Sequence, residues 1–146
     1  MSPSSSRSDA FGFLVARGPV AAATSGPAWL QAMLDAEAAL AGAQADIGEI
    51  PDAAAESIAA ACHIDRFDVD AVLADAASGG NAVIPLVARL RESVGAELAP
   101  YVHLHATSQD IADATARPSH QRAVTALNVD GTAYWPNVRL IIGLAP

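Results

Sequence analysis

The sequence predicts an all-α protein, and two observations carry this prediction. Of the 146 residues, 35 are alanine, which is the strongest helix former and a poor strand former. Apolar residues also recur at spacings of three and four in several segments, which is the period of an amphipathic helix. The length corresponds to about one domain and suffices to bury a core, although alanine contributes little apolar area to it.

The first long helix is expected over residues 28–47. The preceding Thr24-Ser25-Gly26-Pro27 is a typical helix start, and Gly48 is a typical end. The helix would present one apolar stripe, made of Trp29, Leu30, Met33, Leu34, Leu40 and Ala41.

Glu37 lies close to this apolar stripe. A buried carboxylate needs a partner, so one interpretation pairs Glu37 with an arginine such as Arg89 or Arg91. The alternative places Glu37 at the edge of the stripe, in contact with solvent. Both interpretations stay open at the level of the sequence.

A second helix is expected over residues 52–62, after a proline that starts the element. Asp52 would cap it, and Ile58 and Cys62 would point inward. His63 follows the helix end and is interpreted as a surface or capping group, because a lone histidine in this position indicates no ligand site.

Two more helices complete the predicted domain. Asp68 would cap a helix over residues 69–77, which two consecutive glycines end. Pro85 would start a helix over residues 86–98, and Pro100 would end it. The inward stripe of this last helix is Leu86, Val87, Leu90, Val94 and Leu98.

The helical domain is expected to span residues 11–116. Residues 1–10 are serine-rich and polar, which predicts a disordered N-terminus. The short apolar run that follows is interpreted as an arm packing on the domain. Residues 117–146 contain internal prolines and β-branched residues but no amphipathic helix. We interpret this stretch as an atypical tail, either disordered or the product of a frameshift.

The composition excludes several classes of partner. The net charge of -8 argues against nucleic acid and anionic membranes as partners. The single cysteine rules out an intramolecular disulfide and favours a cytoplasmic location. No apolar stretch is long enough to cross a membrane, and the N-terminus lacks the apolar core of a signal peptide.

Several chemically active side chains are clustered in residues 101–113. This stretch holds two histidines, a Thr-Ser pair, an amide and two carboxylates. Thr107, Ser108 and Gln109 offer hydrogen-bond donors, and Asp110 is expected to cap a helix that begins there. Hydrogen-bond donors clustered at a helix start form a binding site for a carboxylate or phosphate.

The same stretch offers residues for a metal site and for a catalytic triad. In an extended segment His103 and His105 share a face, and Asp110 would complete a metal site. A catalytic triad of Ser108, His103 and Asp110 is the second possibility. We predict neither, because two histidines without a third fixed ligand are weak evidence for a metal, and nothing in the spacing aligns a triad.

The run 103–110 reads His-Leu-His-Ala-Thr-Ser-Gln-Asp. It resembles His-x-Gly-Ala-Thr-Ser-Gln-Asp, the first signature of the fumarase/aspartase superfamily, with His105 at the glycine position. Residues 80–87 and the helix around 29–41 are most similar to the 3-carboxy-cis,cis-muconate cycloisomerase branch. The resemblance covers about residues 11–114. It implies the short-helix N-terminal domain of that superfamily, truncated before the central helical bundle.

The resemblance implies an activity and an assembly. The activity is lactonisation of the small polycarboxylate 3-carboxy-cis,cis-muconate, without a cofactor, in the β-ketoadipate pathway of aromatic degradation. The family is homotetrameric, and three subunits each contribute one signature region to an active site. Enzymes of this superfamily eliminate or add across a bond next to a carboxylate: a base removes a proton α to the carboxylate, and hydrogen-bond donors hold the enolate-like dianion.

The resemblance also assigns roles by motif. His103 would orient or contact the substrate, and Thr107 with Ser108 would bind one of its carboxylates. Gln109 and Asp110 would hold the loop. The full set of expected substrate-binding side chains is His103, Asn81, Thr107, Ser108 and Gln109.

The chain departs from the family pattern in two ways. The second signature, with its Thr-x-His, and the third, with its catalytic serine, are absent from the sequence. We therefore expect an incomplete, catalytically impaired protein. His105 replaces a glycine, so the imidazole should strain the backbone or fill the pocket.

Two alternatives to the cycloisomerase interpretation remain. One is another lyase of the superfamily, such as an adenylosuccinate lyase-like protein. The other is a non-catalytic module that binds a carboxylate or a full-length homologue. Because the family's first domain packs on a helical bundle, we also expect an uncovered apolar face, and hence an oligomer, a molten state or aggregation.

Overall fold

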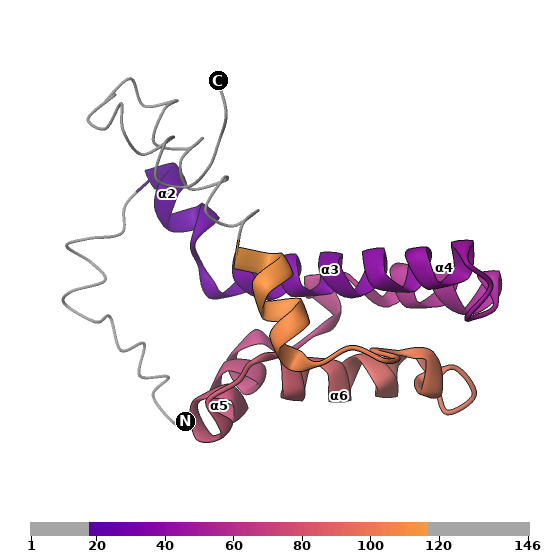
Figure 1. Cartoon of the computed structure of the whole chain (residues 1–146). Coiled ribbons are helices and arrows are strands. Elements are labelled where there is room, and N and C mark those ends of the chain that lie inside the picture. The colour runs from indigo at the N-terminus through magenta and orange to yellow at the C-terminus, as the bar shows by residue number, and fades with distance from the viewer. Residues whose placement is uncertain (1–17, 117–146) are drawn as a thin grey trace, which may run out of the picture.

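The structure is a computed structural model that describes residues 18–116, and these residues fold as helices joined by short loops (Figure 1). A further helix occupies residues 108–116. No strand occurs in this part of the chain, so the all-α prediction is confirmed. The elements in order are α2 (Gly18–Ala23), α3 (Gly26–Asp46), α4 (Asp52–Ala61), η1 (Ile64–Arg66), α5 (Val69–Gly79), α6 (Val83–Val94) and η2 (Ala99–Tyr101).

The long helix α3 is the element on which the others pack. Ser25 caps it by accepting a hydrogen bond from the Ala28 N–H at 3.3 Å, and Pro27 lies in the first turn. Gly48 follows the helix with φ of 75°, a left-handed conformation that glycine adopts without strain. The predicted helix over residues 28–47 is confirmed, with a start two residues earlier.

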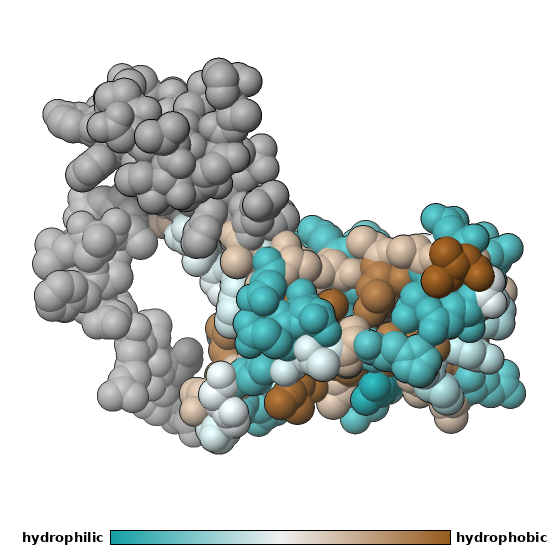
Figure 2. All heavy atoms as spheres, in the orientation of Figure 1, coloured by the Kyte–Doolittle hydropathy of each residue, from teal (hydrophilic) through white to brown (hydrophobic). Residues whose placement is uncertain are grey.

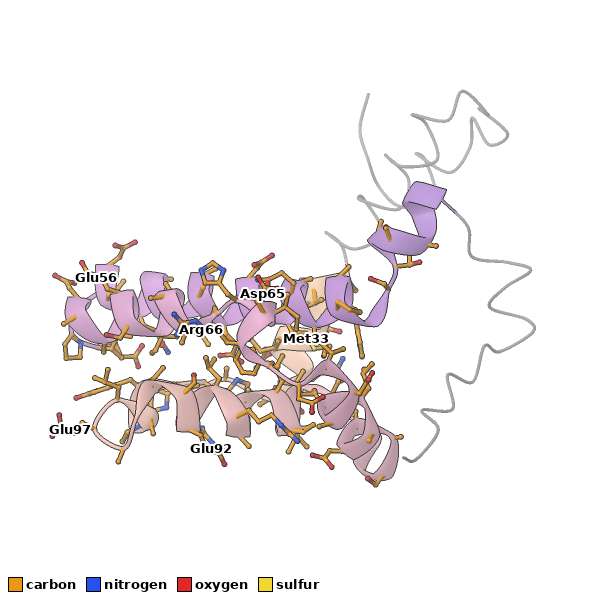
Figure 3. The ribbon with its side chains drawn as sticks, turned by 180° about the vertical axis from the view of Figure 1, so that it is seen from behind. Met33, Glu56, Asp65, Arg66, Glu92 and Glu97 are labelled. Atoms are coloured by element: carbon orange, nitrogen blue, oxygen red, sulfur yellow. The ribbon has the colours of Figure 1, made fainter. Side chains whose placement is uncertain are left out.

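The helices form two layers, with α3 and α4 in one layer and α5 and α6 in the other (Figure 1). The chain after α6 returns along this pair of layers and leads into the 108–116 helix (Figure 1). Met33 lies between the layers and is 1% exposed, whereas Glu56 and Glu92 lie on the outside (Figure 3). The largest fully buried apolar side chains are Leu30, Met33, Leu34, Ile58, Leu86, Leu90, Val72, Val83 and Val102.

Several smaller predictions also hold. Asp68 caps α5 by accepting from the Ala71 N–H at 3.0 Å, and Ile58 and Cys62 are buried. His63 is exposed, as expected of a surface group. Gly80 follows α5 in a left-handed conformation with φ of 71°, so the glycine pair makes a sharp turn.

Three predicted boundaries are wrong. The helix expected over residues 86–98 is α6, which begins at Val83, ahead of Pro85, because Asn81 accepts from the Val83 N–H. It ends at Val94, because Gly95 takes a φ of 86° that breaks the helix about one turn before the predicted end. Asp52 does not cap α4. Pro51 occupies the cap position, and Asp52 lies in the first turn, where the helix dipole still favours its charge.

On the face shown in Figure 2, teal hydrophilic residues separate smaller brown apolar areas. Among the described residues the exposed large apolar side chains are Trp29, Ile47 and Ile84. None of the described helices is both long and apolar enough to cross a membrane. The predictions for the N-terminal arm and for residues 117–146 lie outside the described residues.

Candidate functional site

The segment between η2 and the 108–116 helix has an unusual backbone. His103 has φ of 60° and His105 has φ of 56°. A side chain in this left-handed region costs on the order of 1 kcal/mol or more per residue, so the surroundings must hold it there. The expectation that an imidazole at the glycine position strains the backbone is therefore confirmed. The His105 ring does not fill a pocket, because it is 72% exposed.

Side chains from both layers hold this segment. Arg91 of α6 donates to the Val102 carbonyl at 3.1 Å. Gln44 of α3 donates to the Leu104 carbonyl at 2.8 Å. The His105 ring lies 3.4 Å from a Glu49 carboxylate oxygen, a contact that is largely in solvent and weak.

The strongest of these contacts joins Glu37 of α3 to His103. The His103 Nδ1 lies 2.6 Å from Glu37 Oε1, and the Glu37 side chain is 1% exposed. Burial raises the pKa of Glu37, while the charge and hydrogen bond of His103 and the charge of Arg91 act in the opposite direction. The pair is therefore a short hydrogen bond whose carboxylate is buried.

This pairing corrects both interpretations of Glu37. The carboxylate is not in solvent, and its partner is a histidine. Arg89 pairs with Asp75 at 2.6 Å, and Arg91 uses its guanidinium on a backbone carbonyl. The physical reason is that the returning segment, and not α6, covers the face of α3 that carries Glu37.

The 108–116 helix begins with a reciprocal cap. The Thr107 N–H and hydroxyl both donate to Asp110 Oδ2, at 2.8 and 2.7 Å, and the Asp110 N–H donates to the Thr107 hydroxyl at 3.4 Å. This is the capping-box arrangement, with Thr107 as the cap. The bonds from Thr107 hold the pKa of Asp110 below its ordinary value. Asp110 thus closes the box from the first turn, and the prediction that it is the cap itself is wrong.

The remaining predicted site residues make local contacts. Gln109 donates to the Asp113 carboxylate at 2.7 Å, one turn along the exposed side of the helix. Asn81 accepts from the Val83 N–H at 2.9 Å and so starts α6. Ser108 is half-buried at the first position of its helix. His103, Thr107 and Ser108 thus lie on one short segment of the chain, and Asn81 makes its contact at the start of α6.

The residues of the alternative metal site and of the alternative catalytic triad do not come together. His103 turns to Glu37, and His105 turns to Glu49. Asp110 bonds Thr107 and not a histidine, so no triad with Ser108 forms. Within residues 18–116, no three His, Cys, Asp or Glu side chains are grouped to hold a metal.

Cys62 offers no nucleophile to this site. The side chain is buried, and its burial, together with the charges of Glu37 and Asp35, raises its pKa to about 12. The thiol is therefore protonated at neutral pH and inert.

A cavity of about 530 Å³ lies between α3 and the 108–116 helix. Its lining is mostly small and apolar, with two carboxylates, Asp35 and Asp110, among the groups that face it. An anionic ligand would meet like charge there, so we do not place a carboxylate in this cavity. The lining residues are Ala32, Asp35, Ala36, Ala39, Leu40, Ala106, Asp110, Ile111 and Ala114.

Comparison with known proteins identifies relatives of this helical unit, although no family model matches the chain. The chain is 46% identical over 104 residues to a 3-carboxy-cis,cis-muconate cycloisomerase from Bradyrhizobium diazoefficiens, covering 69% of this chain and 23% of that protein. It is 40% identical over 115 residues to a nitrosuccinate lyase from Streptomyces davaonensis, covering 77% of this chain and 24% of that protein.

Solved structures agree. The crystal structure of 3-carboxy-cis,cis-muconate lactonizing enzyme from Pseudomonas putida superposes with a TM-score of 0.75 at 37% identity, over 82% of this chain and 28% of that chain. The chain is a homologue of the fumarase/aspartase superfamily lyases.

Within the superfamily, the similarity to cycloisomerases is stronger than that to adenylosuccinate lyase, which is 39% identical over 84 residues in the Synechocystis protein. The chain spans about a quarter of the length of the curated relatives it matches, 23% of the Bradyrhizobium protein.

The superfamily signature pointed to the segment 103–110, but not to the residues that hold it. Sequence reasoning missed Gln44 and the pairing of Glu37 with His103. One signal was available: Glu37 and Gln44 are seven residues apart on α3, so two polar side chains recur on one helix face after two turns. A polar pair with that spacing on an otherwise apolar face indicates a polar segment packed against it.

Proposed function

We propose that the helix start at Thr107 and Ser108 binds one carboxylate of a small polycarboxylate, as the first part of a 3-carboxy-cis,cis-muconate cycloisomerase-type site. The observation that carries the proposal is the helix start at Thr107, where the superfamily signature, a hydroxyl pair and the first backbone N–H groups of a helix coincide. Such groups favour an anion through both hydrogen bonds and the helix dipole.

The chemistry of the relatives explains why donors are needed there. Lactonisation joins an oxygen of one carboxylate to a carbon of the more distant double bond, which closes a five-membered ring, and a general acid adds a proton to the carbon next to another carboxylate. Negative charge accumulates on that second carboxylate before the proton arrives. Donors already aimed at it lower the barrier, because they need no reorganisation during the reaction.

The local negative charge limits which groups are left to hold a carboxylate. The chain carries a net charge of -8, and Asp110 lies in the first turn of the helix. The Asp110 carboxylate is already engaged by Thr107, through the backbone N–H and the hydroxyl. An incoming carboxylate would therefore rely on Ser108, on His103 and on the backbone N–H groups that follow.

We further propose that these 146 residues alone bind the substrate without turning it over. The sequence contains only the first of the three superfamily signatures, so neither a general base nor the catalytic serine loop is supplied by it. Another lyase activity of the superfamily is the second candidate. It is supported by the match to nitrosuccinate lyase, which covers 77% of the chain at 40% identity.

Calorimetric titration of the full chain with 3-carboxy-cis,cis-muconate tests the proposal, with adenylosuccinate as the competing ligand. We expect saturable binding of the muconate that Ser108→Ala weakens by about tenfold or more, the cost of one or two lost hydrogen bonds to a charged group. Ser57→Ala is the matched control, because the Ser57 hydroxyl bonds only its own helix, at Ala53.

Three outcomes would contradict the proposal. A folded chain that shows no saturable binding, or a Ser108→Ala variant that binds as well as Ser57→Ala, would remove the carboxylate site. Preferred binding of adenylosuccinate would move the assignment to another branch. Loss of ultraviolet absorbance on incubation with the muconate, abolished in a His103→Ala, Ser108→Ala double variant, would show turnover and refute binding alone.

A further inference from the structure

We propose that Glu37 and Gln44 of α3 are positioning residues of this site. They bond His103 and Leu104 in the turn whose left-handed residues are His103 and His105, and through that turn they set where the helix start at Thr107 and Ser108 lies. The inference rests on the proposed carboxylate site, but the geometry of the turn can be tested without any ligand.

The first observation is where α3 is polar. Its buried face is otherwise made of apolar and small residues, and Glu37 and Gln44 are the buried polar side chains on this helix within the described chain. A buried polar group is costly unless it is hydrogen-bonded. Both find their partners on adjacent residues of one segment, the ring of His103 and the carbonyl of Leu104.

The second observation is that Gln44 is only half satisfied. Its Nε2 donates to the Leu104 carbonyl, but its Oε1 is buried with no hydrogen-bond partner among the described residues. An apolar side chain of similar volume would avoid this unpaired oxygen. Stability alone therefore does not explain a glutamine at this position. The glutamine is explained by the need for one N–H donor that points at the turn.

The third observation is the strain of the turn that these side chains hold. His103 is left-handed, and three consecutive residues, from Val102 to Leu104, are each bonded by a side chain of α3 or α6. A strained backbone conformation persists only where several surrounding contacts hold it in place. Removing one bond should allow the turn to relax towards an unstrained conformation.

The turn is close enough to the helix start to move it. Only two residues separate Leu104 from Thr107, and the chain spans at most about 3.6 Å per residue. The Glu37 contact also fixes the ring of His103, because Nδ1 is engaged and only Nε2 is left to meet a ligand.

The test compares two glutamines of the same helix. Gln44→Met removes the donor to Leu104 and also removes the unpaired oxygen. Gln31→Met is the matched control, because Gln31 also lies on α3 and also bonds distant backbone, accepting from the Ile64 N–H at 2.8 Å and donating to the Cys62 carbonyl at 3.0 Å. Glu37→Met and Glu37→Gln form the second pair, since only glutamine keeps an oxygen that can accept from His103.

Backbone amide NMR signals and muconate titrations of the full-length variants give separate readouts. We expect Gln44→Met and Glu37→Met to shift the amide signals of residues 107–109 and to weaken muconate binding by about tenfold or more, as misplaced groups do. Gln44→Met should leave the melting temperature unchanged or raised. Gln31→Met should lower it while binding per folded molecule stays constant. Glu37→Gln should recover part of the binding that Glu37→Met loses.

The outcomes separate this inference from the proposed function. Unshifted amide signals at residues 107–109 in both Gln44→Met and Glu37→Met would overturn the inference, whatever the ligand does. If the amide signals of residues 107–109 shift but the variants bind muconate with wild-type affinity, Glu37 and Gln44 do not position the site. If the wild-type chain binds no muconate while the amide signals still move, α3 does position the helix start and the carboxylate site is the part that fails.

Discussion

The core of the domain and the segment from Val102 to Thr107 are stabilised in different ways. In the core, side chains such as Leu30, Leu34 and Leu90 are fully buried and held by apolar contact, which has no preferred direction. The segment is held by single hydrogen bonds from individual side chains, and two of its residues are left-handed. The core should therefore tolerate exchanges that keep volume, whereas the segment should not tolerate the loss of one donor.

The largest effect is expected in the core. Leu90→Ala would leave a cavity in the buried core, so we expect a loss of about 2–5 kcal/mol in the free energy of unfolding, measured by urea denaturation. Leu90→Met keeps most of the volume and should cost less than about 1.5 kcal/mol. Alkylation of the buried Cys62 should accelerate in Leu90→Ala only. Equal stabilities for the two variants would refute a tightly packed core.

The contribution of Glu37, which bonds the 102–107 segment, to the free energy of unfolding should depend on pH, unlike that of the apolar core. Because its folded-state pKa is raised above the ordinary value of 4.5, the folded protein holds this proton more tightly than the unfolded chain does. The Glu37 contribution to stability is therefore present below about pH 4.5 and is lost as pH rises through the raised pKa.

Glu37→Gln has no such titration, so its stability relative to wild type should rise with pH, by about 1.4 kcal/mol for each unit by which the pKa is raised. Chemical denaturation of both proteins at a series of pH values measures this difference. A difference that stays constant across the series would contradict the raised pKa.

A smaller and more local effect is expected at the helix start. Thr107→Ala removes the cap hydroxyl and should cost about 1 kcal/mol, visible as faster hydrogen exchange at the first amides of the 108–116 helix. Thr107→Ser keeps the hydroxyl and should behave as wild type. Equal exchange rates in the alanine and serine variants would show that the capping box does not hold this helix.

The smallest effect is a gain. His105→Gly relieves a left-handed residue and loses only an exposed contact with Glu49, so we expect stabilisation by less than about 1 kcal/mol, because glycine also loses more entropy on folding. His63→Gly is the control, since His63 is exposed with an ordinary φ of -123° and should lose stability. Thermal melts of both variants compare them, and the same sign of change in each would refute strain at His105.

Local sequence signals predicted most of the fold. The alanine content and the apolar stripes placed α3, α4, α5 and α6, and the Asp68 cap was correct, because these features depend on residues a few positions apart. The errors came where two local signals competed. At the end of α6, Gly95 and Pro100 are both helix terminators, and only the backbone conformation at Gly95 decided between them.

In the candidate site, too, local features could be predicted from the sequence and contacts between distant residues could not. The sequence by itself determined which segment to examine, because the Thr-Ser-Gln-Asp run is contiguous and its capping residues are three positions apart. Only the tertiary structure decided what holds that segment. Glu37 and His103 are 66 residues apart, and Gln44 and Leu104 are 60 apart. No local rule relates such distant positions, since their pairing depends on how the returning chain packs across α3.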